Sequence, residues 1–200
     1  MHPASAFHQS DKTALAALVA ARGLAMVVGV DEGRPRVAHA PVLFADGLLR
    51  FHLSAMNPLA LALQPGGRAL AVVSGADAYV SPDWYAAADQ VPTWNYVSVE
   101  MEGSLRPLDA AETTDLLDHL SAAFEARLAP KPPWTRAKMT PARFEALVGA
   151  IRGFEMTVER FEGVLKLSQN KPAEVARVAA ALAERPDAGS REIAALMGRL

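Results

Sequence analysis

Tyr79-Val-Ser-Pro-Asp-Trp-Tyr-Ala-Ala-Ala-Asp-Gln-Val-Pro-Thr-Trp-Asn-Tyr96 is the stretch around which the rest of the chain is organised. It holds all three tyrosines and two of the three tryptophans of the chain. Pro82 and Pro92 stiffen its backbone because proline fixes φ. Polar side chains stand beside the rings, namely Ser81, Asp83, Thr93 and Asn95. This mixture suits either a pocket for a flat ligand or a rigid barrel corner whose rings are buried.

The composition is that of a chain with one sizeable hydrophobic core. Its 200 residues are 51% hydrophobic, and this length favours one domain with a small appendage over two equal domains. Lys and Arg number 20 against 22 Asp and Glu, so any contact with nucleic acid would have to rely on a local patch. Because the chain has no cysteine, disulfides and thiolate metal sites are excluded.

Targeting and membrane signals are not visible in the sequence. The first residues, from Met1 to His8, lack a basic start followed by an apolar run. No apolar segment is long enough to cross a bilayer. We therefore expect a soluble protein of the cytoplasm without a membrane partner.

The first part of the chain reads as a helix followed by a meander of strands. Ser10 is placed to cap a short amphipathic helix that ends at Gly23. Alternating apolar residues and turn signals then predict strands over 24–30, 36–44 and 48–53. Asp46-Gly47 is the clearest hairpin signal in the chain. Asn57-Pro58 supplies an N-cap followed by proline and predicts a short helix.

The later part inserts helices between further strands. Residues 69–74 and 97–101 predict two strands. Asp109 and Glu112 have the spacing of a capping box and predict a helix to about Leu128. A helix from Thr140 through Ile151 and a late strand over 153–161 follow. The predicted fold class is mainly β with peripheral helices (α+β), and five or six short strands without a βαβ rhythm favour an antiparallel barrel.

The tail from Pro172 holds two alanine-rich helical segments separated at 186–189, with Ser190 placed to cap the second. A DNA-binding helix-turn-helix is one interpretation. The second segment has few basic or amide side chains, which favours a helical cap that packs on the barrel or on a partner subunit. We expect residues 171–200 to form this C-terminal extension of a domain over 1–170.

Several chemistries have no support in the sequence. Histidines at i, i+4 spacing would indicate a metal site, but those of this chain are scattered, at His2, His8, His39, His52 and His119. Gly66-Gly67 is not followed by the lysine and hydroxyl of a phosphate loop, and no dinucleotide-binding or serine-hydrolase motif occurs. No metal site and no catalytic residue are therefore assigned.

Four segments together resemble one family. They are Arg34-Pro-Arg-Val-Ala-His-Ala-Pro41, Phe51-His-Leu-Ser-Ala-Met-Asn-Pro58, the stretch from Tyr79 to Tyr96, and Lys166-Leu-Ser-Gln-Asn-Lys171. In this order and combination they resemble the PaiB-type FMN-binding proteins, often described as negative transcriptional regulators. The resemblance implies a six-stranded antiparallel split β-barrel that works as a homodimer, with FMN in a groove at the subunit interface.

The resemblance also implies which residues bind FMN. Strand residues Arg36, Val37, Ala38 and His39 would run beside the flavin, although His39 could equally be a core histidine. The phosphate would lie at the strand-to-helix junction, against His52, Leu53, Ser54 and Asn57, although Asn57 also suits a plain N-cap. Trp94 and Asn95 would reach the ring from a neighbouring strand. Lys166 and Gln169 would contact the flavin or its phosphate, from the other subunit; a solvated surface lysine is the alternative for Lys166.

The chain departs from the family pattern at one point. Family members often carry arginine between the histidine and the asparagine, where this chain has Ala55-Met56, so a bidentate phosphate donor is missing. Three functions stay open: an FMN-binding protein with a flavin redox role, as in an FMN-dependent oxidoreductase; a transcriptional regulator that binds DNA; and a split barrel that has lost its flavin and serves as a binding module.

Overall fold

The computed structural model describes residues 2–63 and 66–200. Its strands are β1 (His8–Gln9), β2 (Leu24–Asp31), β3 (Arg34–Ala45), β4 (Leu48–Ser54), β5 (Arg68–Val80), β6 (Thr93–Pro107) and β7 (Ile151–Lys166). They form one antiparallel sheet in the order β1-β7-β4-β3-β2-β5-β6, and β6 also pairs with β7. This second pairing closes β2 to β7 into a ring of six strands. The residue patterns predicted five or six strands and the family resemblance six. The seventh, β1, has only two residues, too few to leave an alternating pattern.

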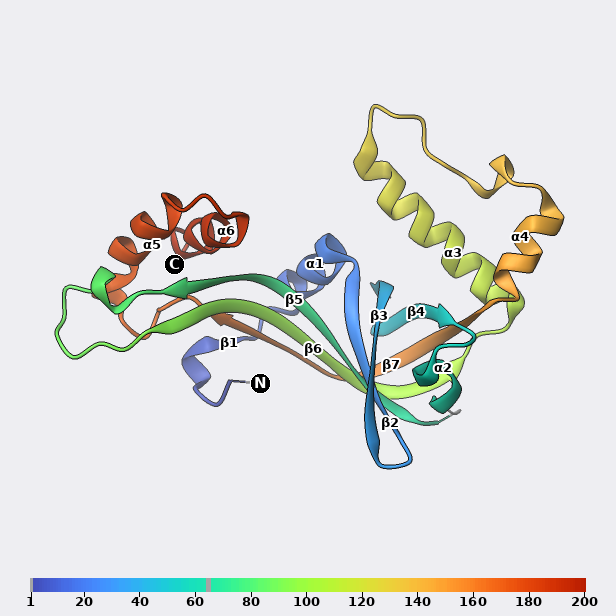
Figure 1. The fold of residues 1–200 in the computed structure, drawn as a ribbon, viewed down its shortest axis with the longest axis horizontal. Coiled ribbons are helices and arrows are strands. Elements are labelled where there is room, and N and C mark those ends of the chain that lie inside the picture. Colours follow the sequence, from blue (N-terminus) through green and yellow to red (C-terminus); the bar gives the residue numbers. More distant parts are fainter. Residues whose placement is uncertain (1, 64–65) are drawn as a thin grey trace. The chain divides into compact units, whose positions relative to one another are not determined.

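Helices lie between and after the strands, as predicted (Figure 1). The α-helices are α1 (Lys12–Arg22), α2 (Pro58–Ala62), α3 (Ala110–Glu125), α4 (Pro141–Val148), α5 (Val175–Ala183) and α6 (Ala188–Met197). Single 3₁₀ turns are η1 (Ser5–Phe7), η2 (Pro82–Trp84), η3 (Ala126–Leu128), η4 (Arg136–Lys138) and η5 (Pro172–Glu174). In the described part of the chain no helix has the length and apolar character needed to span a membrane.

The helix ends confirm some of the predicted caps and boundaries and correct others. The capping box of α3 is confirmed, with Glu112 N donating to Asp109 Oδ1 over 2.8 Å. The caps of α1 and α6 are aspartates rather than the predicted serines: Asp11 Oδ1 accepts from Thr13 N at 2.9 Å, and Asp187 Oδ1 from Ser190 N at 2.7 Å. Helix α4 ends at Val148, because Ile151 already belongs to β7.

Two tight hairpins set the register of the meander. Glu32 and Gly33 have φ of 48° and 76°, and Asp46 and Gly47 have φ of 52° and 76°. Positive φ at both central residues is the type I′ turn, whose twist matches that of the flanking strands. Asp31 then pairs with Arg34, and residue 45 with residue 48. The predicted hairpin at Asp46-Gly47 is confirmed.

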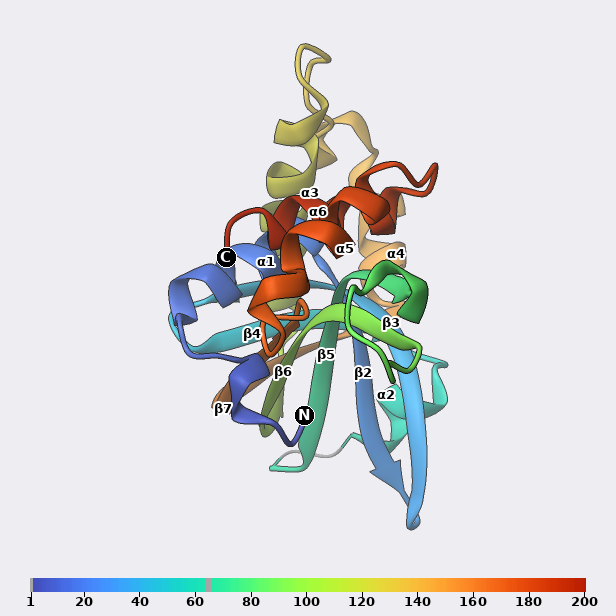
Figure 2. The same ribbon diagram turned by 90° about the vertical axis from the view of Figure 1, so that its left-hand side faces the viewer.

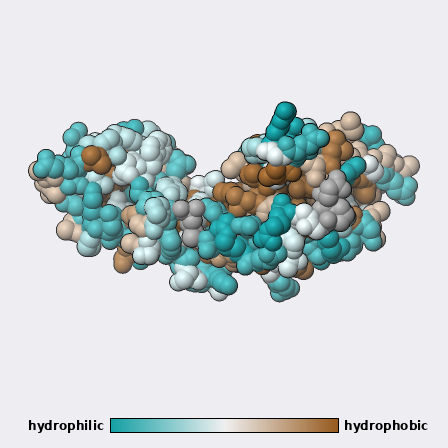
Figure 3. Space-filling view, turned by 90° about the horizontal axis from the view of Figure 1, so that it is seen from below, coloured by the Kyte–Doolittle hydropathy of each residue, from teal (hydrophilic) through white to brown (hydrophobic). Residues whose placement is uncertain are grey.

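The chain divides into two compact units. The hairpin unit comprises residues 19–73 and 100–161, and the helix-pair unit comprises 1–18, 74–99 and 162–200. In the core of the hairpin unit the rings of Phe51 and Phe154 stack with centroids 5.4 Å apart. Figure 3 shows apolar side chains gathered on one face of this unit, whose exposed apolar residues include Val30, Val37 and Leu61.

The helix-pair unit is built around its two C-terminal helices. Figures 1 and 2 show α5 and α6 side by side over the ends of β5 and β6 that belong to this unit. Val178 and Leu182 of α5 and Ile193 and Met197 of α6 are buried against strand residues such as Val97. The apolar faces of both alanine-rich helices are therefore part of a hydrophobic core.

Candidate functional site

Strands β3 and β4 part in the middle of their length. Residues 42–45 of β3 pair with 48–51 of β4. Beyond Phe51, β4 continues only on β7, and before Val42, β3 continues only on β2. A strand without a neighbour on one side leaves every second N–H and C=O on that side without a ladder partner. The parting thus offers backbone donors and acceptors along the first half of β3.

The four predicted flavin-side residues of β3 lie on this half-paired segment. Ala38 is buried, whereas Val37 and His39 are exposed on the opposite face of the strand. Because His39 is exposed, its alternative interpretation as a core histidine is wrong. Arg36 is occupied by an ion pair with Asp31, with both Nε and an Nη 3.2 Å from Oδ2.

The predicted phosphate junction follows at the end of β4. Asn57 is the N-cap of α2, and its Oδ1 accepts from Leu59 N at 2.9 Å. Ser54 accepts from two of the next N–H groups, that of Met56 at 3.3 Å and that of Asn57 at 2.9 Å, and Ala55 N donates to the Ala150 carbonyl. These backbone N–H groups are engaged within the protein, and α2 has only five residues. A phosphate here would depend on side-chain cations.

His52 is the unsatisfied group at this junction. Among the described residues its Nδ1 is the one buried side-chain nitrogen or oxygen without a hydrogen-bond partner. Burial lowers the pKa of His52, which favours the neutral imidazole. A buried polar atom left unpaired costs roughly 1–3 kcal/mol. His52 therefore keeps one hydrogen-bonding atom that no described residue satisfies.

The cation of Arg152 lies beside the junction. Arg152 of β7 pairs in register with Leu53, and one of its Nη atoms is 3.4 Å from the Ala60 carbonyl of α2. Its side chain is exposed and that hydrogen bond is long. The sequence reading missed Arg152, because 99 residues separate it from Leu53 and only the β4–β7 register brings them together.

Trp94 of the helix-pair unit is accessible to a ligand. Its side chain is 54% exposed, and its ring stands edge-on to that of Tyr79 with centroids 6.0 Å apart. The two rings line a hollow of about 470 Å³ together with Trp84, Asp77 and Arg185. Part of the aromatic stretch therefore forms a surface pocket, while Tyr85 is buried.

Asn95 points the other way. It is 0% exposed, its Nδ2 donates to Ser168 Oγ at 3.0 Å, and Ser168 Oγ donates back to its Oδ1 at 3.2 Å. Met197 Sδ lies 3.6 Å from the same amide nitrogen. Asn95 thus satisfies its amide inside the core of the helix-pair unit, and its predicted contact with flavin stays a prediction.

Lys166 and Gln169 differ in how many of their polar atoms are already hydrogen-bonded within the protein. Gln169 is fully used, because its Nε2 donates to the carbonyls of Ala6 and Leu165 and its Oε1 accepts from Leu167 N. Lys166 is half-buried, with its Nζ 2.6 Å from Thr93 Oγ1. The predicted contact of Lys166 with the flavin or its phosphate stays a prediction.

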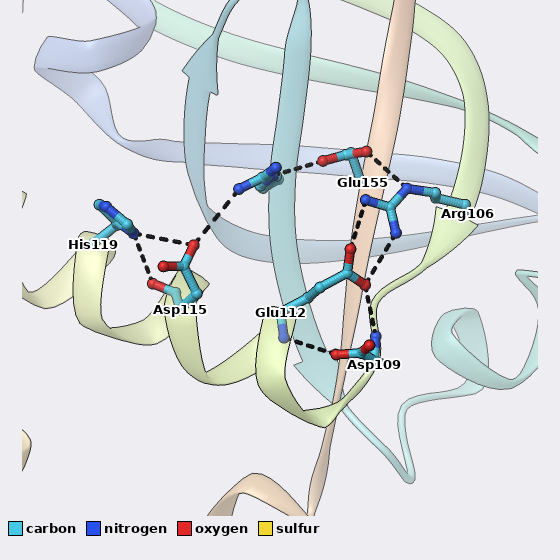
Figure 4. Close-up of polar contacts among 7 residues, drawn as sticks. Arg106, Asp109, Glu112, Asp115, His119 and Glu155 are labelled. Atoms are coloured by element: carbon cyan, nitrogen blue, oxygen red, sulfur yellow. Dashed lines mark hydrogen bonds and ion pairs between the residues drawn. The ribbon is translucent and has the colours of Figure 1, made fainter.

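A charged network that the sequence did not reveal lies in the hairpin unit (Figure 4). Glu155 of β7 accepts from Arg50 Nε at 2.6 Å and from Arg106 Nε at 2.8 Å. Arg106 continues to Glu112 of the α3 capping box at 2.9 Å. Each of these four residues pairs with at least one other, so the network holds strands and helix together. Among the described residues, no cluster of three or more candidate ligands could hold a metal ion.

Comparison with known proteins identifies related sequences. The sequence model of a family described as "Putative FMN-binding domain" matches residues 1–160. The protease synthase and sporulation protein PAI 2 of Bacillus subtilis (strain 168) is 30% identical over 149 residues, which cover 72% of this chain and 70% of that relative.

Solved structures show the same fold. A FAD and heme binding protein from Mycobacterium smegmatis aligns over 80% of this chain and 73% of its own, with a TM-score of 0.58 and 20% identity. The flavocytochrome Anf3 from Azotobacter vinelandii aligns over 82% and 72%, with a TM-score of 0.62 and 17% identity. At these identities the likeness concerns the fold alone, and it confirms the predicted split-barrel class.

Proposed function

The chain belongs to the FMN-binding domain family, whose cofactor is FMN, and we propose that it holds FMN where β3 parts from β4 and uses it in redox chemistry. The observation that carries this proposal is the open edge of β3, together with the unpaired Nδ1 of His52 on β4, the strand from which β3 parts. When bound, FMN supplies electron and hydride transfer, and the protein supplies position and electrostatics.

The residues at the parting fit two of the three parts of FMN directly. The flat ring needs apolar walls and hydrogen-bond partners at its edge. Val37 is an exposed apolar residue on this part of β3 and provides such a wall, and the β3 backbone together with His52 offers the partners. His39 and Val37 are exposed on the same strand and complete the proposed cofactor contacts.

The phosphate is the part for which the family's usual donor is missing. Ala55 and Met56 replace it, and Met56 is 81% exposed. Arg152 has its guanidinium beside this junction, and among the described residues it makes one long hydrogen bond, to the Ala60 carbonyl. We assign it the role of the phosphate cation, since an arginine can bind a phosphate through two parallel hydrogen bonds.

We further propose that the protein acts as a homodimer with the flavin at the subunit interface. The support is the exposed apolar surface: Tyr79, Val91 and Trp94 in the helix-pair unit, and the apolar face of the hairpin unit in Figure 3. Large exposed apolar patches mark interaction sites. Light scattering during size exclusion should give twice the chain mass of 21.3 kDa; a monomeric mass at all concentrations would contradict the dimer.

The absorbance spectrum of the purified protein tests cofactor binding. We expect flavin bands that stay with the protein through desalting, or that appear after FMN is added and the excess removed. NADH and NADPH serve as probes of redox function, because either one should bleach the bound flavin anaerobically if it is a reductant for this protein. A colourless protein that takes up neither FMN nor riboflavin would overturn the proposed function.

A further inference from the structure

Two lysines of the helix-pair unit donate to side chains of the same short segment, residues 90–93. Lys166 stands at the end of β7 and Lys171 five residues later, and both side chains are half-buried. The Nζ of Lys166 donates to Thr93 Oγ1 at 2.6 Å. The Nζ of Lys171 donates to the side-chain oxygen of Gln90 and lies 4.3 Å from the ring centre of Tyr85.

Neither ammonium group has a carboxylate partner within the part of the chain that the structure describes. Glu174, the acidic residue nearest to Lys171 in sequence, instead accepts from Ala86 N at 2.9 Å. By contrast, Lys131 is paired with Glu125. The pKa of Lys166 is lowered, first by burial and then by the charge of Lys171. Two partly buried like charges without a counter-charge are costly unless an anion joins them.

Several hydrogen-bond donors of this cluster are free to bind a ligand. A hydroxyl that accepts from an ammonium keeps its own proton to donate, and this is the position of Thr93 Oγ1. Each lysine ammonium carries three donor protons, and the hydrogen bond from Lys166 to Thr93 uses one of them. The Nε2 of Gln90 donates to the Ala88 carbonyl. Such a surface complements an acceptor-rich, negatively charged group.

We propose that Lys166, Lys171 and the hydroxyl of Thr93 form a binding site for the oxyanion, phosphate or carboxylate, of a small ligand. An oxyanion placed between the two ammonium groups would neutralise both and accept from the threonine, in charge-assisted hydrogen bonds. The ligand is either FMN itself, through its phosphate, or a second anionic compound such as a phosphorylated or carboxylated reaction partner. The site stands on the lysine geometry and does not depend on where the flavin ring lies.

Calorimetric titration with inorganic phosphate and pyrophosphate tests the site. The protein as purified should bind pyrophosphate more tightly than phosphate, and Lys166→Met and Lys171→Met should each weaken binding about tenfold or more. Lys166→Arg keeps the charge and should retain binding, and Thr93→Val should weaken it with little change of shape. Lys138→Met, at an exposed lysine whose Nζ contacts the Pro133 carbonyl, is the matched control and should bind as the unmodified protein does.

FMN and riboflavin, which lacks the phosphate, identify the source of the anion. Loss of FMN affinity but not riboflavin affinity in Lys166→Met and Lys171→Met assigns the site to the cofactor phosphate. Unchanged FMN affinity, with pyrophosphate still binding to the FMN-loaded protein, assigns it to a second ligand. The proposal is overturned if the unmodified protein binds neither anion, or if the folded methionine variants bind both as well as it does. A failure to take up any flavin would instead contradict the proposed function and leave the anion site unaffected.

Discussion

Arg106 Nε donates a 2.8 Å hydrogen bond to Glu155 Oε1, and this carboxylate residue is only 7% exposed. Arg50 Nε occupies the other oxygen at 2.6 Å. Burial alone would raise the pKa of Glu155, but the hydrogen bonds from the two arginines outweigh it and hold the pKa below its ordinary value. The buried charge thus ties β7 to β4 and β6 within the hairpin unit (Figure 4).

Glu155→Gln keeps the side-chain volume but removes the charge between the two arginines. We expect the free energy of unfolding to fall by about 2 kcal/mol. The loss stays below that of a fully buried pair, because both arginines are roughly half-exposed. Urea denaturation measures it. Glu184→Gln, at an exposed carboxylate, is the control and should stay within about 0.5 kcal/mol; equal losses in both variants would refute this account.

Stability should depend on pH through the same carboxylate. Because the folded-state pKa of Glu155 lies below its ordinary 4.5, the group stabilises the fold above that value, and its contribution is lost as pH falls through the folded-state pKa. The difference in unfolding free energy between unmodified protein and Glu155→Gln should therefore shrink below about pH 4.5. Urea titrations at a series of pH values measure this difference. A difference that grows as the pH falls would contradict the lowered pKa of Glu155.

His52→Phe should separate cofactor binding from stability. Phenylalanine fills a similar volume and removes the unpaired Nδ1, so apo-protein stability should stay within about 1 kcal/mol or rise. Affinity for FMN should fall about tenfold, because a ligand hydrogen bond is lost. Flavin fluorescence titration and thermal denaturation provide the two readouts. His119→Asn, at an exposed histidine of α3, is the control and should bind FMN normally; undiminished binding by His52→Phe would remove histidine from the site.

Arg152→Met tests the phosphate assignment at the junction. We expect FMN affinity to fall about tenfold while riboflavin affinity is unchanged, since only FMN carries the phosphate. Ala55→Arg restores the donor that the family pattern contains, and combined with Arg152→Met it should recover most of the lost affinity. If the double variant binds FMN no better than Arg152→Met alone, position 55 does not face the phosphate.

Gly103→Ala should disrupt the pairing of β6 with β7. A Cβ at this position would stand 1.8 Å from the carbonyl oxygen of Thr157. Because this oxygen belongs to the backbone, it cannot move away by a change of side-chain rotamer. We expect a loss of about 3 kcal/mol or more in unfolding free energy, or failure to fold. Gly149→Ala, where the nearest atom would be 3.5 Å away, is the matched control and should change stability by less than about 1 kcal/mol.

Local signals in the sequence predicted local structure well. The Asp46-Gly47 turn, the Asn57-Pro58 helix start and the Asp109–Glu112 capping box each depend on a few neighbouring residues, and each is present. Asp11 and Asp187 were overlooked as caps because a serine stood close by and both residue types are good N-caps. The end of α4 was misplaced because an apolar strand follows it after two residues.

The site could not be predicted to the same depth, because its contacts join distant parts of the sequence. Lys166 meets Thr93 across 73 residues, and Arg50 meets Glu155 across 105. Family resemblance pointed to Lys166 and passed over Lys171, although both belong to the same six-residue motif. Composition alone also gave no means to see that Asn95 is buried while its neighbour Trp94 is exposed, since adjacent residues of a strand face opposite sides.

The position of β7 has a practical consequence for anyone who shortens this protein. The family match ends at residue 160, but β7 runs from Ile151 to Lys166, so a chain cut at the match boundary would be severed in mid-strand. The cut would also discard Leu167 and the four large buried residues that α5 and α6 supply to the helix-pair unit. Aggregation of such a fragment would reflect a missing half of a hydrophobic core, and would carry no information about flavin.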